Sequence, residues 1–289
     1  MNNLLEIKGL GKTFNNFSLE NIHLTLPTGY IMGLIGGNGA GKTTTINLIL
    51  NKLQKDSGDI KIFGLDHVID EKVIKEDLGV IFDEVSIVRE WTLKEVEKAY
   101  KLFYKKWDSN KFYKYLEEFG LNSHAKVSDL SRGMSVKLML ATAFAHDAKL
   151  LILDEPTSGL DPASRDALME ILQDYIEDGT KSVLFSTHIT SDLDKVADYI
   201  TCIDNGKMFF TGTKDELLET YRRIKGGPNE YIPYEKQIIG LRRYVAGFEG
   251  MIKVKDLNNL GPTIEVENLT IEDILIFISR EGKQSDRKH

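Results

Sequence analysis

A glycine-rich segment constrains this chain more than any other feature. Residues Gly36 to Thr44 have the sequence GGNGAGKTT and satisfy the pattern G-x-x-x-x-G-K-[ST]. The apolar run Ile31 to Ile35, a predicted buried strand, precedes the segment, and a predicted helix from Lys42 to Leu53 overlaps its end. Glycines let the backbone turn tightly and point N–H groups inward, and the helix N-terminus adds a partial positive charge. The segment therefore predicts a phosphate-binding loop.

Within this loop, Lys42 is predicted to reach the β and γ phosphates of ATP, and the Thr43 hydroxyl is predicted to bind Mg²⁺. The alternative is a glycine-rich turn before an unrelated helix, which the spacing and the strand-to-helix context disfavour. The residues expected to contact ATP are Gly36, Gly37, Asn38, Gly39, Ala40, Gly41, Lys42, Thr43 and Thr44.

A second segment, LLILDEPTSGLDP, begins at Leu150. Its apolar run ends in Asp154, which places a carboxylate at the C-terminal end of a predicted strand, where α/β proteins bind ligands. Asp154 is therefore a candidate Mg²⁺ ligand, directly or through water. Glu155 follows it and is a candidate for orienting and deprotonating a water that attacks the γ-phosphate. The alternative is that both acids cap the next helix at the surface.

Further apolar runs of strand length, Leu78 to Phe82 and Ser182 to Phe185, lack polar alternation, as expected of parallel strands covered on both faces. Between about Thr92 and His146 the hydrophobic period becomes helical. The apolar residues of this insertion fall on one face of each of two predicted helices: Leu93, Val96, Tyr100, Phe103, Tyr104 and Trp107 on the first, and Phe112, Leu116 and Phe119 on the second. This aromatic stripe predicts the core of a helical insertion, and the alternative is that part of it lines a partner-binding groove.

After about Gly212 the pattern changes again. A helical stretch from Lys214 to Tyr221 is followed by a turn-rich segment and by a possible helix from Gln237. Two strands, near residues 252–254 and 263–267, and a helix from Ile271 to Arg280 complete a small folded appendage. It could strengthen or regulate a dimer, or cover an exposed sheet edge.

Composition narrows the class of partner. The 289 residues contain 37 Lys and Arg against 44 Asp and Glu, a net charge of −7, which disfavours nucleic acid as the main partner. No apolar run approaches the roughly 20 residues needed to cross a bilayer. The N-terminal residues show no secretory signal, and the single Cys202 fits a reducing cytoplasm. We therefore expect a cytoplasmic chain without a membrane span of its own.

With these segments in place, residues 4 to about 220 resemble the ATP-binding subunits of ABC transporters. The segment LSRGM, Leu130 to Met134, lies 20 residues before LLILDEP and is similar to the family's LSGGQ signature, from which Arg132 and Met134 depart. The resemblance implies that Ser131 and Gly133 contact the γ-phosphate of ATP bound to a second subunit. A hydroxyl and free N–H groups at the start of a helix running to His146 suit that role.

Three further positions match the family pattern. Asp161 in SGLDP resembles the D-loop residue at the dimer seam, and His188 in STH resembles the switch histidine that contacts the γ-phosphate. Phe14 occupies the place of the aromatic that stacks on adenine. Phe17 is a rival, and burial of Phe14 between antiparallel strands is the alternative. The implied catalytic set is Glu155, His188 and Lys42.

The resemblance implies an α/β fold: a P-loop NTPase core with a mostly parallel sheet, an antiparallel β edge, a helical insertion and a small α+β C-terminal appendage. We expect the ATP-binding core in residues 1–91 and 147–220, the helical signature subdomain in 92–146 and the accessory region in 221–289.

The resemblance also implies a function, ATP hydrolysis that powers a transporter. Similarity to cassettes of Gram-positive bacteria favours export of peptides or antibiotics, and import stays open. The expected partners are a second copy of the chain and a polytopic membrane subunit, docked between the core and the helical insertion on the cytoplasmic face of the membrane. The alternatives are a cytosolic ABC-type ATPase and a regulatory nucleotide switch. The cargo is not encoded here, because the membrane subunit contacts it.

One position departs from the family pattern and gives a test. The family usually has Gln at the end of the strand Leu78 to Phe82, where this chain has Asp83 and then Glu84. A carboxylate can hold Mg²⁺ or its water but cannot donate a hydrogen bond when ionised. We expect Asp83→Ala to lower ATPase turnover by about tenfold or more. Unchanged turnover at saturating Mg²⁺ would show that Asp83 is not the metal-sensing residue.

Overall fold

A large sheet forms the centre of the molecule. The structure, a computed structural model, describes residues 2–82 and 87–286, so that Asp83 and Glu84 lie outside the described residues. The strands of this sheet are β1 (Asn3–Thr13), β2 (Ser18–Pro27), β3 (Ile31–Ile35), β4 (Ser57–Ile62), β5 (Leu65–Asp66), β6 (Leu78–Ile81), β7 (Leu150–Asp154), β8 (Ser182–Thr187), β9 (Tyr199–Asp204) and β10 (Lys207–Thr213). In the described part of the chain they pair in the order β5-β4-β1-β2-β10-β9-β3-β8-β7-β6.

The sheet has a parallel part and an antiparallel part, as the sequence predicts. Strands β9, β3, β8, β7 and β6 are mutually parallel, whereas β1 pairs antiparallel with β2 and β4. Ile35, the last residue of β3, lies opposite Thr187, the last residue of β8. Asp154, the last residue of β7, lies opposite Ser186. The three strands therefore end at one edge of the sheet, where the loops that leave them lie side by side.

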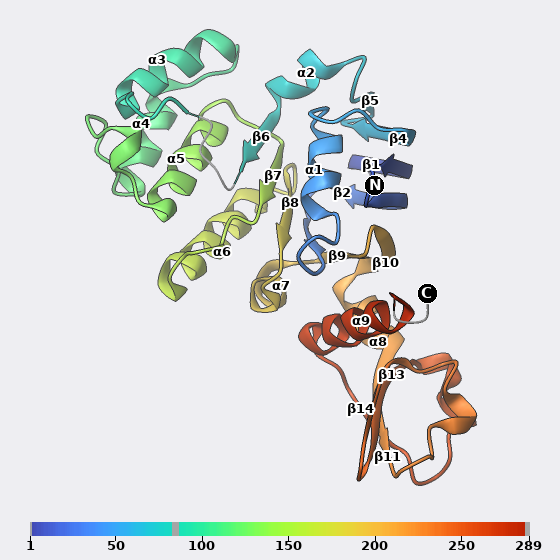
Figure 1. The fold of residues 1–289 in the computed structure, drawn as a ribbon. Helices are drawn as coiled ribbons and strands as arrows, with labels where there is room; N and C mark the ends of the chain where they lie inside the picture. The colour runs from blue at the N-terminus through green and yellow to red at the C-terminus, as the bar shows by residue number, and fades with distance from the viewer. Residues whose placement is uncertain (1, 83–86, 287–289) are drawn as a thin grey trace.

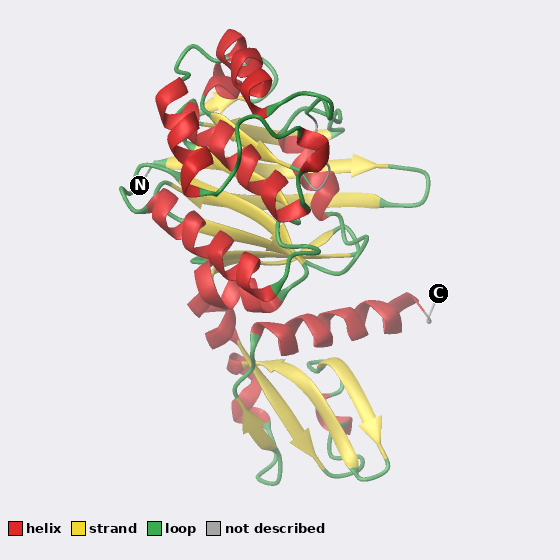
Figure 2. Ribbon diagram, turned by 90° about the vertical axis from the view of Figure 1, so that its left-hand side faces the viewer, coloured by secondary structure: helices red, strands yellow, loops and turns green. Residues whose placement is uncertain are grey.

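Helices cover both faces of this sheet (Figures 1 and 2). They are α1 (Lys42–Ile49), α2 (Glu71–Glu76), α3 (Leu93–Phe103), α4 (Ser109–Glu118), α5 (Arg132–Ala145), α6 (Pro162–Ile176), α7 (Thr190–Val196) and α8 (Lys214–Thr220), with a short 3-10 turn at Val127–Asp129. Side chains of β3 alternate between two separate cores: Ile31 and Ile35 pack on the side of the helical insertion, and Met32 and Leu34 on the side of α1. This alternation explains why the strand is apolar throughout.

The helical insertion consists of α3, α4 and α5, and α3 begins at the expected position. Thr92 accepts a hydrogen bond from the Glu95 backbone while Glu95 bonds back to Thr92, which is a capping box. The helix ends at Phe103, four residues before Trp107, and only part of the aromatic stripe is core. Phe112 is fully buried, whereas the Phe103 side chain is 76% exposed. The interpretation of the whole stripe as core is therefore wrong at Phe103.

The C-terminal region is a small α+β unit, as expected. Its strands are β11 (Tyr221–Gly226), β12 (Ile239–Tyr244), β13 (Gly247–Lys253) and β14 (Glu265–Glu267), its helix is α9 (Ile271–Asp286), and 3-10 turns lie at Ile232–Tyr234 and Val254–Asn259. The strands form an antiparallel sheet in the order β12-β13-β11-β14, and α9 packs across β12.

The helix predicted from Gln237 is wrong, because this segment forms strand β12 and pairs with β13. Gly240 adopts a φ of +63°, and a Cβ atom there would lie 2.3 Å from the carbonyl oxygen of Phe277 in α9. The glycine thus lets α9 approach the strand closely, and this long-range contact is invisible in the local pattern. Among the described residues, no helix is both long and apolar enough to traverse a bilayer.

Candidate functional site

The glycine-rich loop connects β3 to α1 and lines a cavity of about 440 Å³. Gly39 and Gly41 have φ values of +77° and +114°, which only glycine adopts at little cost. A Cβ atom at Gly41 would lie 2.9 Å from the Leu19 side chain, so this position also lacks room. The cavity is lined by Phe17, Gly37, Asn38, Gly39, Ala40, Gly41, Lys42, Thr43, Thr44, Glu155, Ser158 and His188. The loop therefore shares one cavity with the predicted Glu155 and His188.

Lys42 stands at the centre of a charged cluster. Its side chain is 6% exposed, and its Nζ donates to the carbonyl oxygens of Gly36 (2.9 Å) and Gly37 (3.3 Å). The same Nζ lies 3.2 Å from Oε1 of Glu155, and Oε2 of Glu155 lies 2.7 Å from Nδ1 of His188. A buried ammonium is stable only when such oxygens surround it. The cluster thus joins the loop to the ends of β7 and β8.

Asp154 and Thr43 form the candidate metal position. The Thr43 hydroxyl donates to Oδ1 of Asp154 at 3.3 Å, and the Ser186 hydroxyl donates to the same oxygen at 2.6 Å. Hydroxyl and carboxylate oxygens suit Mg²⁺, which keeps few protein ligands beside phosphate and water. Among the described residues, no cluster of three or more His, Cys, Asp or Glu side chains could hold a metal.

Sequence reasoning missed Ser186. Its hydroxyl also accepts a hydrogen bond from the Glu155 backbone N–H at 2.9 Å, so one buried side chain orients both acids. Ser186 reaches the two acids only through the parallel register of β7 and β8, which places Asp154 opposite Ser186. Nothing in the one-dimensional pattern fixes that register.

Ser131 and Gly133 lie apart from the chain's own glycine-rich loop. Ser131 caps α5 by accepting from the Met134 N–H at 3.3 Å. Both residues line a small cavity with Leu160 and Ser164 at the start of α6, not the loop cavity. Contact of Ser131 and Gly133 with a nucleotide on another chain stays a prediction from the resemblance.

Asp161 caps α6. It accepts from the backbones of Ala163 (3.0 Å) and Ser164 (3.1 Å) and from the Ser164 hydroxyl (2.5 Å). The hydroxyl bond is the largest of the causes that hold the pKa of Asp161 below its usual value. The loop between Glu155 and Asp161 is also fixed at Thr157, whose hydroxyl donates to the buried Asp192 at 2.6 Å. Burial raises the pKa of Asp192.

The structure separates the two aromatic candidates. Phe17 lines the loop cavity, whereas Phe14 is 40% exposed and does not line it. The two rings are neighbours, with centroids 6.2 Å apart. Phe17, the rival at the sequence level, is thus the aromatic nearer the loop.

A second feature that sequence reasoning missed is the approach of α9 to the loop. A cavity of about 650 Å³ is bounded by Gly36 and Gly37 on one side and by residues of α9, including Glu272 and Ser279, on the other. His188 lines this cavity as well. The helix also contacts β9, which is an interior strand of the main sheet, so the appendage does not act as a lid on a sheet edge.

The geometry defines a class of protein. The glycine-rich loop with its buried lysine follows β3 and leads into the N-terminus of α1. The Asp-Glu pair lies at the end of β7 and the histidine directly follows β8, so these groups meet at one edge of the sheet. This is the arrangement of a P-loop ATPase, in which positioned charges stabilise phosphoryl transfer to water.

Comparison with known proteins identifies the family. Residues 19–158 match the family model described as ABC transporter. The chain is 34% identical over 208 residues to the ABC transporter ATP-binding protein YdbJ of Bacillus subtilis, covering 71% of this chain and 68% of that protein. It is 28% identical to the bacitracin transport ATP-binding protein BcrA of Bacillus licheniformis, over 99% of this chain and 96% of that protein. A solved ATP-binding subunit of an ABC transporter superposes with a TM-score of 0.68 at 29% identity, covering 74% of this chain and 91% of that one.

The chain therefore belongs to the family of ABC transporter ATP-binding proteins. Members of this family bind ATP and hydrolyse it, and the chain is an ATPase of this type.

The position of Ser186 gives a test. Ser186→Ala removes the donor to Asp154 and leaves the Glu155 N–H without its acceptor, so we expect a loss of about 1–3 kcal/mol in unfolding free energy. Because the two acids lose their common anchor, we also expect turnover to fall by about tenfold with a smaller change in KM for ATP. Thermal unfolding and steady-state ATPase assays measure the two effects.

Ser182 is the matched control. It is equally buried at the other end of β8, where its hydroxyl bonds to the Gly29 N–H and the Pro27 carbonyl, far from the acids. Ser182→Ala should lower stability with turnover near that of the unsubstituted protein. Equal losses of turnover in the two variants would contradict the assigned role of Ser186.

Proposed function

We propose that this chain is the ATP-hydrolysing subunit of an exporter of peptides or antibiotic-like compounds, and that two copies enclose two ATP molecules. The observation that carries the proposal is the Lys42–Glu155–His188 cluster at the loop cavity, with Ser131 and Gly133 presented elsewhere on the same chain. The relative named for bacitracin transport supports the substrate class, because it aligns along nearly the whole chain, including the C-terminal region.

In this proposal, the loop N–H groups and Lys42 bind the β and γ phosphates. Lys42 must exchange the carbonyl oxygens of Gly36 and Gly37 for phosphate oxygens, which releases Glu155 from its ion pair. Glu155 then orients and deprotonates the attacking water, and His188 donates a hydrogen bond to the γ-phosphate. Thr43 and Asp154, with Asp83 as a further candidate, would hold Mg²⁺, which neutralises charge on the phosphates.

The remaining contacts come from two sources. Phe17, with Phe14 beside it, supplies an aromatic surface for the adenine ring at the edge of the loop cavity. Ser131 and Gly133 of the second copy add a hydroxyl and helix N-terminal N–H groups to the γ-phosphate, and Asp161 lies at the seam between the copies. Both ATP sites are then complete only in the dimer.

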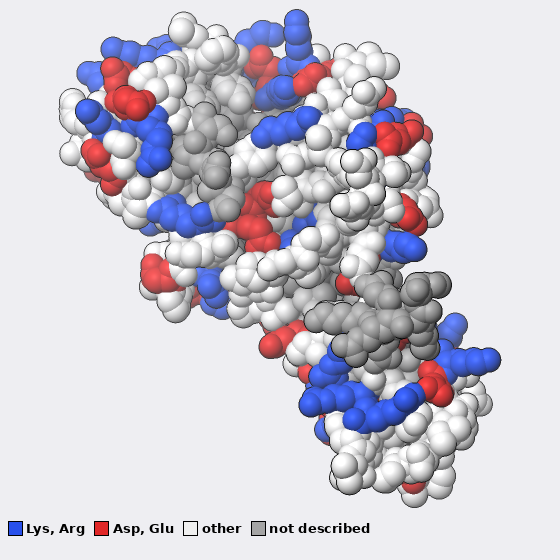
Figure 3. Space-filling view, in the orientation of Figure 1, with Lys and Arg blue, Asp and Glu red and all other residues white. Residues whose placement is uncertain are grey.

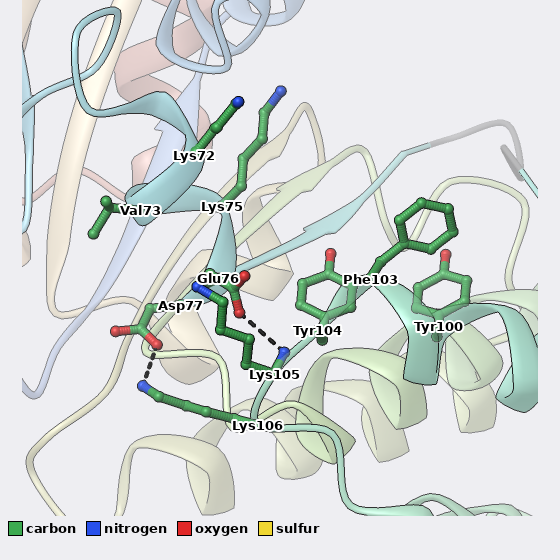
Figure 4. Close-up of a pocket in the computed structure, with 10 residues that line it drawn as sticks. All are labelled: Lys72, Val73, Lys75, Glu76, Asp77, Tyr100, Phe103, Tyr104, Lys105 and Lys106. Carbon is green, nitrogen blue, oxygen red and sulfur yellow. Dashed lines mark hydrogen bonds and ion pairs between the residues drawn. The ribbon is translucent and has the colours of Figure 1, made fainter.

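We further propose that a polytopic membrane subunit docks in a groove between α2 and the end of α3 (Figure 4). The groove has a volume of about 890 Å³ and joins the ATP-binding core to the helical insertion. Tyr100, Phe103 and Tyr104 supply its apolar wall. Burial raises the pKa of both tyrosines, that of Tyr100 to about 12, so their hydroxyls stay protonated at neutral pH.

The charge of the groove suits a particular kind of segment. Four lysines, at positions 72, 75, 105 and 106, line it together with Glu76 and Asp77. Asp77 already pairs with Lys106 at 2.6 Å and with Lys149 at 2.9 Å. In the space-filling view, basic side chains gather along the top of the molecule, with acidic side chains among them (Figure 3). A partner helix with one apolar face and acidic flanks fits these walls, and docking there would hold the chain at the cytoplasmic face of the membrane.

The test of ATP-dependent pairing is Glu155→Gln. This change removes the base while keeping the size of the side chain, so we expect turnover to fall by about 10³-fold. We also expect a stable dimer with bound ATP, measured by light scattering on a sizing column with ATP and Mg²⁺. Glu170→Gln, an exposed site on α6, is the control and should leave turnover unchanged. If the Glu155→Gln protein stays monomeric in saturating ATP, the proposal that two copies enclose two ATP molecules is wrong.

The test of docking uses two neighbouring residues of α3. Phe103→Glu places a charge on the apolar wall of the groove, and Leu102→Glu does the same at an 84% exposed position that does not line it. Upon co-expression with membrane proteins encoded beside this chain, the Phe103 variant should lose co-purification of the polytopic subunit in detergent. It should keep basal ATPase turnover, since α3 is remote from the loop cavity. Loss in both variants, or in neither, would place docking elsewhere.

A further inference from the structure

Arg132 departs from the family's usual glycine, and its contacts suggest a reason. It is the first residue of α5, directly after Ser131, and its Nη2 donates to the backbone carbonyl of Glu155 at 3.4 Å. The stem of the side chain lies across Gly159, where an added Cβ atom would stand 3.3 Å from Cδ of Arg132. The start of α5 therefore contacts the Glu155 loop of the same chain.

A neighbouring contact reinforces this junction. A Cβ atom at Gly133 would lie 3.5 Å from the Leu160 side chain and 3.9 Å from the Ser164 hydroxyl, so the signature segment packs on the end of the same loop and on α6. The signature segment (Leu130–Met134) and the loop after β7 thus form one packed unit within a chain.

The backbone of Glu155 needs support from outside. Its φ is +49°, in the left-handed region that a residue with a side chain seldom occupies and that is costly to hold. The Ser186 hydroxyl accepts from its N–H at 2.9 Å, and Arg132 donates to its carbonyl. The peptide groups on both sides of the Glu155 Cα are therefore held, and with them the direction in which the carboxylate points.

We propose that Arg132 is a positioning residue that sets Glu155 of its own chain and couples this carboxylate to the ATP that the signature segment binds on the partner. The proposal rests on the proposed function, because it requires Ser131 and Gly133 to contact the nucleotide of a second copy. Closure of the signature segment over one ATP moves the start of α5, and Arg132 transmits that movement to the catalytic carboxylate of the other site.

The first experiment compares Arg132→Ala with Arg132→Lys. The alanine variant loses the donor to the Glu155 carbonyl, and we expect turnover to fall by about tenfold while KM for ATP changes less than about twofold. Lysine keeps a charged donor on a long stem, so it should restore turnover to within about threefold of the original. An unchanged turnover in Arg132→Ala, or a loss carried by KM, would overturn the proposal.

The second experiment asks on which chain Arg132 acts. It uses mixed dimers, in which the two chains carry different tags and are purified through both. The measured quantity is the rate of a single turnover of prebound ATP. Each mixed dimer has one chain with Glu155→Gln, so only one site can hydrolyse. When Arg132→Ala lies on the chain that keeps Glu155, we expect about a tenfold slower rate than in the reference dimer of original and Glu155→Gln chains. When Arg132→Ala and Glu155→Gln share one chain, we expect the reference rate, which also shows that the substituted chain folds.

The outcomes distinguish a failure of the coupling through Arg132 from a failure of the proposed function. The reverse pattern would mean that Arg132 acts on the partner's nucleotide, and equal slowing in both arrangements would mean a structural role; either overturns the proposal. If the reference dimer forms and hydrolyses ATP, these two results leave the proposed function standing. If no ATP-dependent dimer forms, the proposed function and the coupling through Arg132 fail together.

Discussion

The need to surround one buried ammonium with oxygen atoms organises this molecule. Lys42 is nearly inaccessible to solvent, and a charge in that position is costly unless several acceptors face it. Its acceptors come from the glycine-rich loop and from Glu155, which in turn contacts His188. These groups follow three different strands. The cluster can form only if the three strands end side by side. The chemistry of the site therefore depends on the order of these strands in the sheet.

The parallel part of the sheet meets this requirement through its register. Ile35 lies opposite Thr187, and Asp154 opposite Ser186, which fixes the relative height of the segments that carry the site. The strands are buried on both faces in two separate cores, so shifting one strand by a residue would exchange the residues of both cores. A rigid sheet that carries polar groups at its strand ends and on the following loops places those groups precisely relative to one another.

The sequence predicts the parts of the site that are encoded locally and misses those that depend on pairing at a distance. The glycine-rich loop and the Asp154–Glu155 pair each adjoin, along the chain, the strand that presents them. Their spacing in the sequence is therefore enough to predict where they lie. Ser186 acts only through the register of β7 and β8. The local pattern predicts a helix where β12 forms, because it contains no sign of the close approach between Gly240 and α9. The preference between Phe14 and Phe17 likewise depends on how the β1–β2 hairpin meets the loop, which no local pattern records.

The C-terminal helix shows how a region outside the motifs can bear on the loop. At one end α9 is packed tightly, since a Cβ atom at Gly282 would lie 2.6 Å from the Asn205 amide nitrogen. Along its length the same helix leaves a cavity against Gly36 and Gly37. The glycine-rich loop therefore has free space on its α9 side, with the helix on the far side of that space. The C-terminal helix thus forms one wall of a cavity that Gly36 and Gly37 also line, a contact that the motifs themselves do not indicate.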